Sequence, residues 1–230
     1  METDVNSAGS RDGKGRQART RLARRAVVEA ARALFLERGY AGTTIEAISD
    51  RSDVPQATVY RLFSSKVGIL KSLLDVSVVG DDKAVAMQDR PHVRALLAGR
   101  GPENQLSGFA GNTRDVMSRS EPLYRILVSA AGSDPDAAAL LAEQTRQRQQ
   151  GQGLIAHSLA CAGALRSELR EHDAADIIHV LMSPEVYRLL VTDRGWVPER
   201  YEQWLKAILI DQLLSPSPVR EADTESRHLN

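Results

Sequence analysis

Cysteine is nearly absent from this chain, and aromatic residues are scarce. The one cysteine among 230 residues, Cys161, excludes a disulfide within the chain and a zinc site with several thiolate ligands. Its neighbours, HSLACAGAL, predict a small side chain packed inside a helix. Aromatic residues make up 4% of the sequence whereas Ala, Leu and Arg are frequent, so the composition favours helices over sheets.

Long apolar runs are also missing, as is an excess of charge of one sign. No run approaches the roughly 18 residues of a membrane-spanning helix. The N-terminus is polar rather than signal-like, so we expect a cytoplasmic protein without a membrane partner. The formal net charge is zero, but residues 1–66 carry 12 Lys and Arg against 8 Asp and Glu, and the remainder carries 18 against 22. This division predicts a polyanionic partner for the first part only.

The first 18 residues are rich in Gly, Ser, Asp and Arg and lack periodicity, so we expect a disordered basic arm over residues 1–18. The basic run continues to Arg25. Taken alone, it is as typical of a solubilising segment as of a binding one. A neighbouring DNA-reading unit favours binding, because a basic arm can follow phosphates or enter the minor groove. The predicted phosphate contacts in this run are Arg16, Arg19 and Arg21.

A helical pattern starts near Thr20 and carries a small apolar core. Apolar residues recur at helical spacing from Ala23 to Phe35, and Gly39 suits the end of this helix. Two shorter helices follow. Together the three helices are expected to enclose these side chains: Val27, Ala31, Leu34, Phe35, Ile45, Ile48, Val54, Val59 and Phe63.

The two shorter helices are separated by a tight turn. Thr43 stands three residues before Glu46, the spacing of a capping box, which predicts a helix opening at Thr44. Asp53 is a residue type that tolerates the left-handed backbone of a sharp turn. Pro55 suits the first turn of the next helix.

The outer face of that next helix is polar and suits a DNA groove. Val59 and Phe63 lie four residues apart and are expected to face inward, which turns the remaining side chains outward. Arg can bind guanine, Gln can bind adenine, and Ala or a Thr methyl can touch thymine. The predicted base contacts are Gln56, Ala57, Thr58 and Arg61.

The stretches LFLERGY, TTIEAIS and VPQATVYRLFSSK, within about residues 20–75, resemble the DNA-binding domain of the Tet repressor family of bacterial transcriptional regulators. The sequence departs from the family pattern at three positions. Asp53 replaces the usual Gly of the turn, Pro55 replaces a Ser, and Leu62 replaces a His or Tyr. The Pro55 change loses a capping hydroxyl, typically worth ~1 kcal/mol.

The resemblance implies further contacts to DNA phosphates. Tyr60 and Lys66 stand at positions that contact phosphate in the family, although Tyr60 could instead pack and Lys66 could be solvated. Thr43 or Thr44 would contact phosphate at the positive end of the second helix. These residues would position the protein on the duplex rather than specify a sequence.

The remainder of the chain is expected to be helical, so the fold class is all-α. Further helices are predicted at residues 65–80, 91–98, 104–119, 122–131, 135–161, 173–192 and 198–214. The domain plan is a helix-turn-helix DNA-binding domain over residues 19–66, a helical regulatory and dimerisation domain over residues 67–214, and a disordered tail over residues 215–230.

The last two predicted helices carry more apolar surface than one small domain readily covers, which predicts a homodimer. The family dimerises through its last two helices, and the run SPEVYRLLVTDRGWVPERYEQWL resembles the C-terminal domain of its actinobacterial members. The predicted interface residues are Ile178, Leu181, Leu189, Trp204, Ile208 and Leu209.

The resemblance also implies a pocket for a small-molecule effector within the helical domain. Packing in the core is an open alternative for each candidate lining residue: Met87, Phe109, Met117, Tyr124, Leu127, His157 and Tyr187. His157 and Cys161 share one helix but lack further thiolate partners, so we predict no metal site. No catalytic motif or phosphate loop is present, so we expect neither an enzyme nor a bound cofactor.

The sequence as a whole predicts a repressor that binds a palindromic DNA operator as a dimer and is released by a small-molecule effector. Two other classes stay open. One is a ligand-blind or architectural DNA-binding protein. The other is a helical small-molecule-binding protein or enzyme with a vestigial DNA-binding head.

Overall fold

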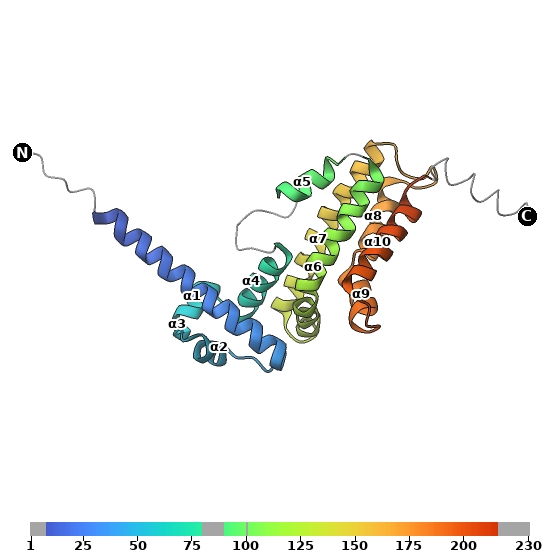
Figure 1. The fold of residues 1–230 in the computed structure, drawn as a ribbon. Helices are drawn as coiled ribbons and strands as arrows, with labels where there is room; N and C mark the ends of the chain where they lie inside the picture. The colour runs from blue at the N-terminus through green and yellow to red at the C-terminus, as the bar shows by residue number, and fades with distance from the viewer. Residues whose placement is uncertain (1–7, 80–89, 100, 216–230) are drawn as a thin grey trace, which may run out of the picture. The chain divides into compact units, whose positions relative to one another are not determined.

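The structure is a computed structural model that describes residues 8–79, 90–99 and 101–215 (Figure 1). All regular structure in these ranges is helical apart from one isolated bridge between Leu165 and Leu214. The helices are α1 (Ala8–Arg38), α2 (Ile45–Ser52), α3 (Gln56–Phe63), α4 (Lys66–Val79), α5 (Pro91–Leu97), α6 (Pro102–Ala131), α7 (Pro135–Cys161), α8 (Glu171–Leu181), α9 (Pro184–Tyr187), the π-helical turn η2 (Arg188–Thr192) and α10 (Pro198–Leu213). The predicted all-α fold class is confirmed.

The chain divides into two compact units, and the division falls inside α4, α6 and α7. The first unit comprises Met1–Val76 and Pro122–Leu141, and the second comprises Ser77–Glu121 and Ala142–Asn230. The segment Pro122–Leu141 therefore belongs to the unit of the helix-turn-helix, although the sequence predicted a boundary at residue 66.

The core of the first unit forms where α1 to α4 meet the adjoining ends of α6 and α7. Eight of the nine side chains predicted for a three-helix core are buried there, and the ninth, Ile45, packs against them half-buried. Leu70 of α4, Leu127 of α6 and Leu140 of α7 extend the cluster. This core is larger than predicted because the segment Pro122–Leu141 contributes to it.

The core of the second unit is built from the remaining parts of α6 and α7 with α5, α8, α9 and α10. Its largest fully buried side chain is Tyr201 of α10, which belongs to the same cluster as Leu106 and Ile178. Among the described helices, none combines the length and the hydropathy that a membrane span needs.

The helices differ from the prediction in three main places. The first helix begins at Ala8, so residues 8–18 of the predicted arm are helical, whereas residues 1–7 and the tail from residue 216 lie outside the described residues. Helix α6 is continuous through Pro122, where two helices were predicted. The predicted helix over residues 173–192 is divided, because Ser183 caps a new helical turn by accepting a hydrogen bond from the Val186 amide.

Candidate nucleic-acid interface

Helices α2 and α3 form the predicted helix-turn-helix. Asp53 occupies the left-handed region with φ 53° and ψ 35°, and its amide donates to the carbonyl of Ser49 at the end of α2. The Ser49 hydroxyl donates to the carbonyl of Val54 at 2.8 Å, which closes the turn from the other side. Val59 and Phe63 of α3 are buried, as predicted. The turn therefore fixes α3 against the core by one face.

The start of α2 lies one residue later than predicted. Thr44, not Thr43, is the N-cap, and its hydroxyl accepts from the Ala47 amide at 3.1 Å. Thr43 is fully buried and donates to the carbonyl of Gly39 at 2.8 Å. The prediction that Thr43 caps α2 is therefore wrong. Its buried hydroxyl is also out of reach of a phosphate, whereas Thr44 is exposed.

The outer face of α3 is available to a partner. Gln56, Ala57 and Arg61 are exposed and Thr58 is half-buried. The Tyr60 side chain is 51% exposed, so it does not serve as core packing. These five side chains come from a single eight-residue helix.

Helix α1 stabilises the position of α3 and α4 through direct contacts. Arg24 donates to the carbonyl of Leu62 at 3.2 Å and to the Ser72 hydroxyl at 2.9 Å, and its guanidinium lies 4.6 Å from the centre of the Phe63 ring. Arg51 of α2 pairs with Glu37 of α1 at 2.8 Å. One arginine of the basic run thus braces α3 and α4 from α1.

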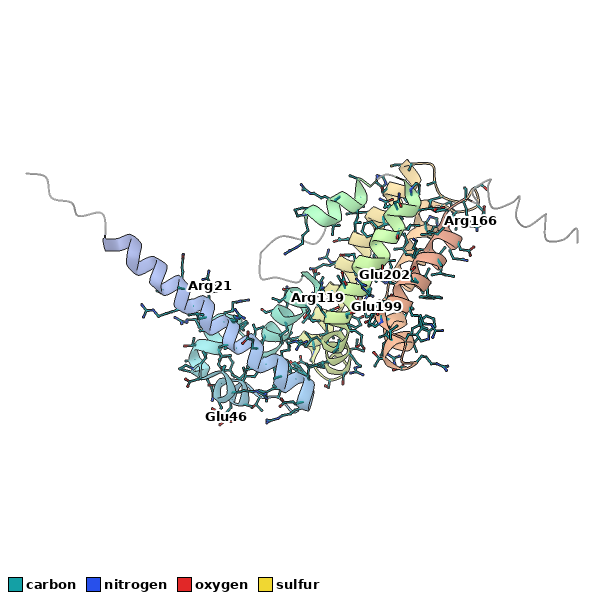
Figure 2. All side chains as sticks on the ribbon, in the orientation of Figure 1. Arg21, Glu46, Arg119, Arg166, Glu199 and Glu202 are labelled. Carbon is teal, nitrogen blue, oxygen red and sulfur yellow. The ribbon has the colours of Figure 1, made fainter. Side chains whose placement is uncertain are left out.

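The three arginines predicted to contact phosphate lie on α1. Arg16, Arg19 and Arg21 are all exposed, and Figure 2 shows where Arg21 leaves the helix. A helix holds the Cα atoms of these residues at a fixed spacing, which a disordered arm does not.

Lys66 is more confined than the resemblance implies. Its ammonium donates to the carbonyls of Tyr40 and Thr43, each at 2.9 Å, and lies 4.0 Å from the centre of the Tyr40 ring. Burial lowers the pKa of Lys66. The ammonium has three N–H donors, so one beyond the two carbonyl bonds is left for a DNA phosphate.

The structure brings together only part of the predicted effector pocket. Phe109, Met117 and Tyr187 share the core of the second unit, and the Tyr187 hydroxyl and Ser118 hydroxyl form a hydrogen bond of 2.9 Å. Three other candidates do not belong to this core, and their place in an effector pocket stays a prediction. Tyr124 and Leu127 belong to the core of the first unit, and His157 is exposed. Met87 lies outside the described residues.

Cys161 is exposed at the end of α7, so the prediction of a packed side chain is wrong. Its sulfur lies 3.5 Å from Nε2 of His157, whose Nδ1 lies 3.1 Å from a carboxylate oxygen of Glu171. The predicted helix was right, but Cys161 lies on the exposed side of its final turn, whereas Leu159 of the same turn is fully buried. Among the described residues no group of three or more His, Cys, Asp or Glu side chains could hold a metal ion.

The predicted dimer residues separate into two groups. Ile178 and Leu209 are fully buried in the core of their own chain and are not free for a partner, which corrects the prediction for both. Leu181, Trp204 and Ile208 are half-buried, and Leu189 is 49% exposed. Val180 and Val197, each 60% exposed, were missing from the prediction. Helical periodicity could have placed Val180 on the outer side of α8, two positions from buried Ile178.

The capped α2, the left-handed turn and the exposed polar face of α3 define a helix-turn-helix DNA-binding protein. Residues 27–73 match the family described as "Bacterial regulatory proteins, tetR family". The HTH-type transcriptional regulator TcmR of Streptomyces glaucescens is 30% identical over 167 residues, which cover 69% of each chain. The HTH-type transcriptional repressor KstR of Mycobacterium tuberculosis is 31% identical over 116 residues, 50% of this chain and 49% of the relative.

The chain belongs to the TetR family of transcriptional regulators. A solved structure supports the same fold. NalD of Pseudomonas aeruginosa, described as the secondary repressor of the MexAB-OprM multidrug efflux pump, has a TM-score of 0.68. Its sequence identity is 17%, and the match covers 86% of this chain and all of that one.

Proposed function

We propose that this protein is a cytoplasmic, effector-responsive repressor that binds an approximately palindromic DNA operator as a homodimer. Transcriptional regulation by a DNA-binding helix-turn-helix follows from the family. The observation that supports the specific reading of an operator is the exposed polar face of α3, held against the core by Val59 and Phe63.

Base reading is assigned to the exposed side chains at the start and middle of α3: Gln56, Ala57, Thr58 and Arg61. Tyr60, Thr44 and the arginines of α1 supply the phosphate contacts, which set affinity and orientation but carry no sequence information. Lys66 joins these contacts through the ammonium donor that the carbonyls of Tyr40 and Thr43 leave unused.

A homodimer is supported by the apolar surface of the second unit. Val180 of α8, Leu189 of η2 and Val197 before α10 are exposed aliphatic side chains, and half-buried Trp204 and Ile208 accompany them. Exposed apolar groups in this number are typical of a surface that a partner covers. A two-fold dimer presents two copies of α3 to successive major grooves about 34–36 Å apart.

An effector site in the second unit is supported by a polar group in an apolar core. Tyr201 is fully buried, and among the described residues its hydroxyl has no hydrogen-bond partner. Burial raises the pKa of Tyr201, so the hydroxyl keeps its proton. Its ring packs against Tyr187 at a centroid distance of 4.9 Å. We therefore expect a mainly apolar effector that offers one oxygen acceptor, because an unpaired buried hydroxyl costs about 1–3 kcal/mol.

The proposed function is tested with a DNA duplex that the protein enriches from a randomised library. Gel-shift titrations over a range of salt concentrations should show an affinity that falls by about 0.9 log unit per log unit of salt for each phosphate contact. Failure to enrich any duplex, or an affinity that does not respond to salt, would contradict the assignment of this face as a DNA reader.

The effector part of the proposal has its own test. Thermal melting across a panel of small apolar metabolites should identify compounds that raise the melting temperature and release the enriched duplex. A panel that produces neither effect favours a ligand-blind DNA-binding protein, while the DNA titrations above stay valid.

A further inference from the structure

Asp134 lies in the connection between α6 and α7, far outside the residues that match the family. It begins α7, because its Oδ1 accepts from the amides of Asp136 at 2.9 Å and Ala137 at 3.3 Å. This leaves Oδ2 for a second partner. The Tyr40 hydroxyl donates to Oδ2 at 2.7 Å. Asp134 and Tyr40 belong to the same compact unit, so a residue of the α6–α7 connection directly contacts the end of α1.

Tyr40 is the point where three parts of the first unit meet. It follows Gly39, which ends α1 with a positive φ of 69°, and its ring stacks on Phe35 with centroids 5.9 Å apart. Its carbonyl and ring also receive the Lys66 ammonium. Asp134, Tyr40 and Lys66 thus form one chain of contacts from the start of α7 to the start of α4.

These contacts hold both ends of the turn from Tyr40 to Thr43, which leads into α2. Lys66 holds the carbonyls of Tyr40 and Thr43, and Thr44 is the N-cap of α2. The position of α3 follows from that of α2 through the Asp53 turn. The hydrogen bond from the Tyr40 hydroxyl lowers the pKa of Asp134, and the charge of Lys66 contributes in the same direction. A carboxylate is therefore the form that the site favours.

We propose, resting on the proposed operator-binding function, that Asp134 is a positioning residue for operator binding. Through the Tyr40 hydroxyl, it fixes the turn between α1 and α2 and so the placement of the recognition helix α3. Asp134 itself touches no DNA. Its role is to limit the orientations of the helix-turn-helix, which matters for a specific duplex and matters little for binding held by phosphate contacts alone.

The test is a double-mutant cycle on operator affinity with three variants: Tyr40→Phe, Asp134→Ser and the two combined. Tyr40→Phe keeps the ring against Phe35 and Lys66 and removes only the hydroxyl. Asp134→Ser keeps a side chain that caps a helix as well as Asp does, and removes the oxygen that accepts from Tyr40. The matched control is Asp136→Ser, which removes the same charge two residues further along α7.

Each single variant should bind the enriched duplex about 10- to 150-fold more weakly, the range of a lost hydrogen bond to a charged group. The combined variant should be no weaker than either single one, because both changes remove the same contact. Affinity for an unrelated duplex should stay within twofold of the wild type for every variant, and Asp136→Ser should match the wild type on both duplexes.

Circular dichroism at the assay temperature shows whether each variant is folded. The cycle is measured at a temperature at which the wild type, both single variants and the combined variant are folded. The proposal is overturned by single variants that bind the enriched duplex within twofold of the wild type. It is equally overturned by additive losses in the combined variant, or by an equal loss on the unrelated duplex. The last result would assign Asp134 to overall stability or charge.

Discussion

Asp53 adopts a backbone conformation that most residues avoid. Its φ of 53° and ψ of 35° close the turn between α2 and α3. A residue with a Cβ pays roughly 1–2 kcal/mol in the left-handed region, and Asp offsets part of this cost because its short polar side chain can bond locally. The family usually has Gly at this position, and the turn here keeps the backbone geometry that Gly would adopt.

We therefore expect Asp53→Ala to lower the free energy of unfolding by about 1 kcal/mol, whereas Asp53→Gly should cause no loss. Urea denaturation of the three proteins measures the difference. Equal stability of the Ala and Gly variants would show that backbone strain at residue 53 is not what selects Asp.

The contribution of Asp134 to stability should depend on pH. Its pKa is lowered in the folded protein, first by the Tyr40 hydroxyl and then by backbone amides and Lys66. The ionised carboxylate therefore stabilises the fold above the ordinary Asp pKa of about 4, and this contribution is lost as the pH falls toward the lower folded-state value.

Chemical denaturation of the wild type and of Asp134→Ser should show the largest stability difference near neutral pH. The difference should shrink as the pH falls below about 4. A difference that stays constant across this range would show that charge at Asp134 has no part in stability. The Asp136→Ser variant serves again as the control for a carboxylate at the start of α7.

At the residue scale, the sequence predicted side chains whose environment depends on local periodicity. Val59 and Phe63 lie four apart on a short amphipathic helix, and both are buried as expected. Thr43 and Thr44 were not separable in this way. Thr43 does not cap α2 because its hydroxyl donates to the carbonyl of Gly39. That hydrogen bond depends on the conformation of the folded turn.

Among the elements, α3 is the one whose side chains differ most in the roles proposed for them. Arg61→Ala should relax the sequence preference at one base pair and weaken binding to the enriched duplex by about 1–3 kcal/mol. Tyr60→Phe should weaken binding to all duplexes to a similar extent, because the Tyr60 hydroxyl is proposed to contact a DNA phosphate. Selection from a randomised library with each variant provides the measurement, and a uniform loss across sequences with Arg61→Ala would refute base reading by this residue.

The elements also show where a local pattern misleads. Pro122 predicted a break, since proline removes an amide donor and crowds the preceding turn. Helix α6 nevertheless continues through it, with Leu123 and Leu127 fully buried directly afterwards. Apolar contacts of α6 with the first unit's core outweigh the cost of the proline. Near Ser183 the pattern misled in the other direction. The apolar run predicted one continuous helix, but the Ser183 hydroxyl caps a new helical turn within it.

At the scale of the whole molecule, the exposed aliphatic side chains of the second unit predict an association of two chains. Leu189→Glu places a charge on this surface and should convert a dimer to a monomer in analytical ultracentrifugation. Binding of the enriched duplex should weaken by more than tenfold at the same time, because two linked reading helices bind far more tightly than one.

Leu154→Glu is the matched control, since Leu154 of α7 is also an exposed leucine of the second unit. It should leave the sedimentation coefficient and the duplex affinity unchanged. If Leu189→Glu also stays dimeric, the proposed interface is misplaced.

The division of the molecule into units was less predictable than its fold class. Helical composition and spacing indicated an all-α chain, and the helix-turn-helix was specified by a few residues near Asp53. The inclusion of Pro122–Leu141 in the first unit depends on contacts between residues far apart in sequence, such as that of Tyr40 with Asp134. No periodic pattern carries that information.

The exposed Cys161 has a practical consequence. Because it is the single cysteine of the chain and lies in solvent at the end of α7, a maleimide-linked spin label attaches at one defined place in the unmodified protein. Two associated chains would then yield one inter-label distance distribution. Recorded with and without the DNA duplex and candidate effectors, that distribution follows the separation of the second units without any mutation.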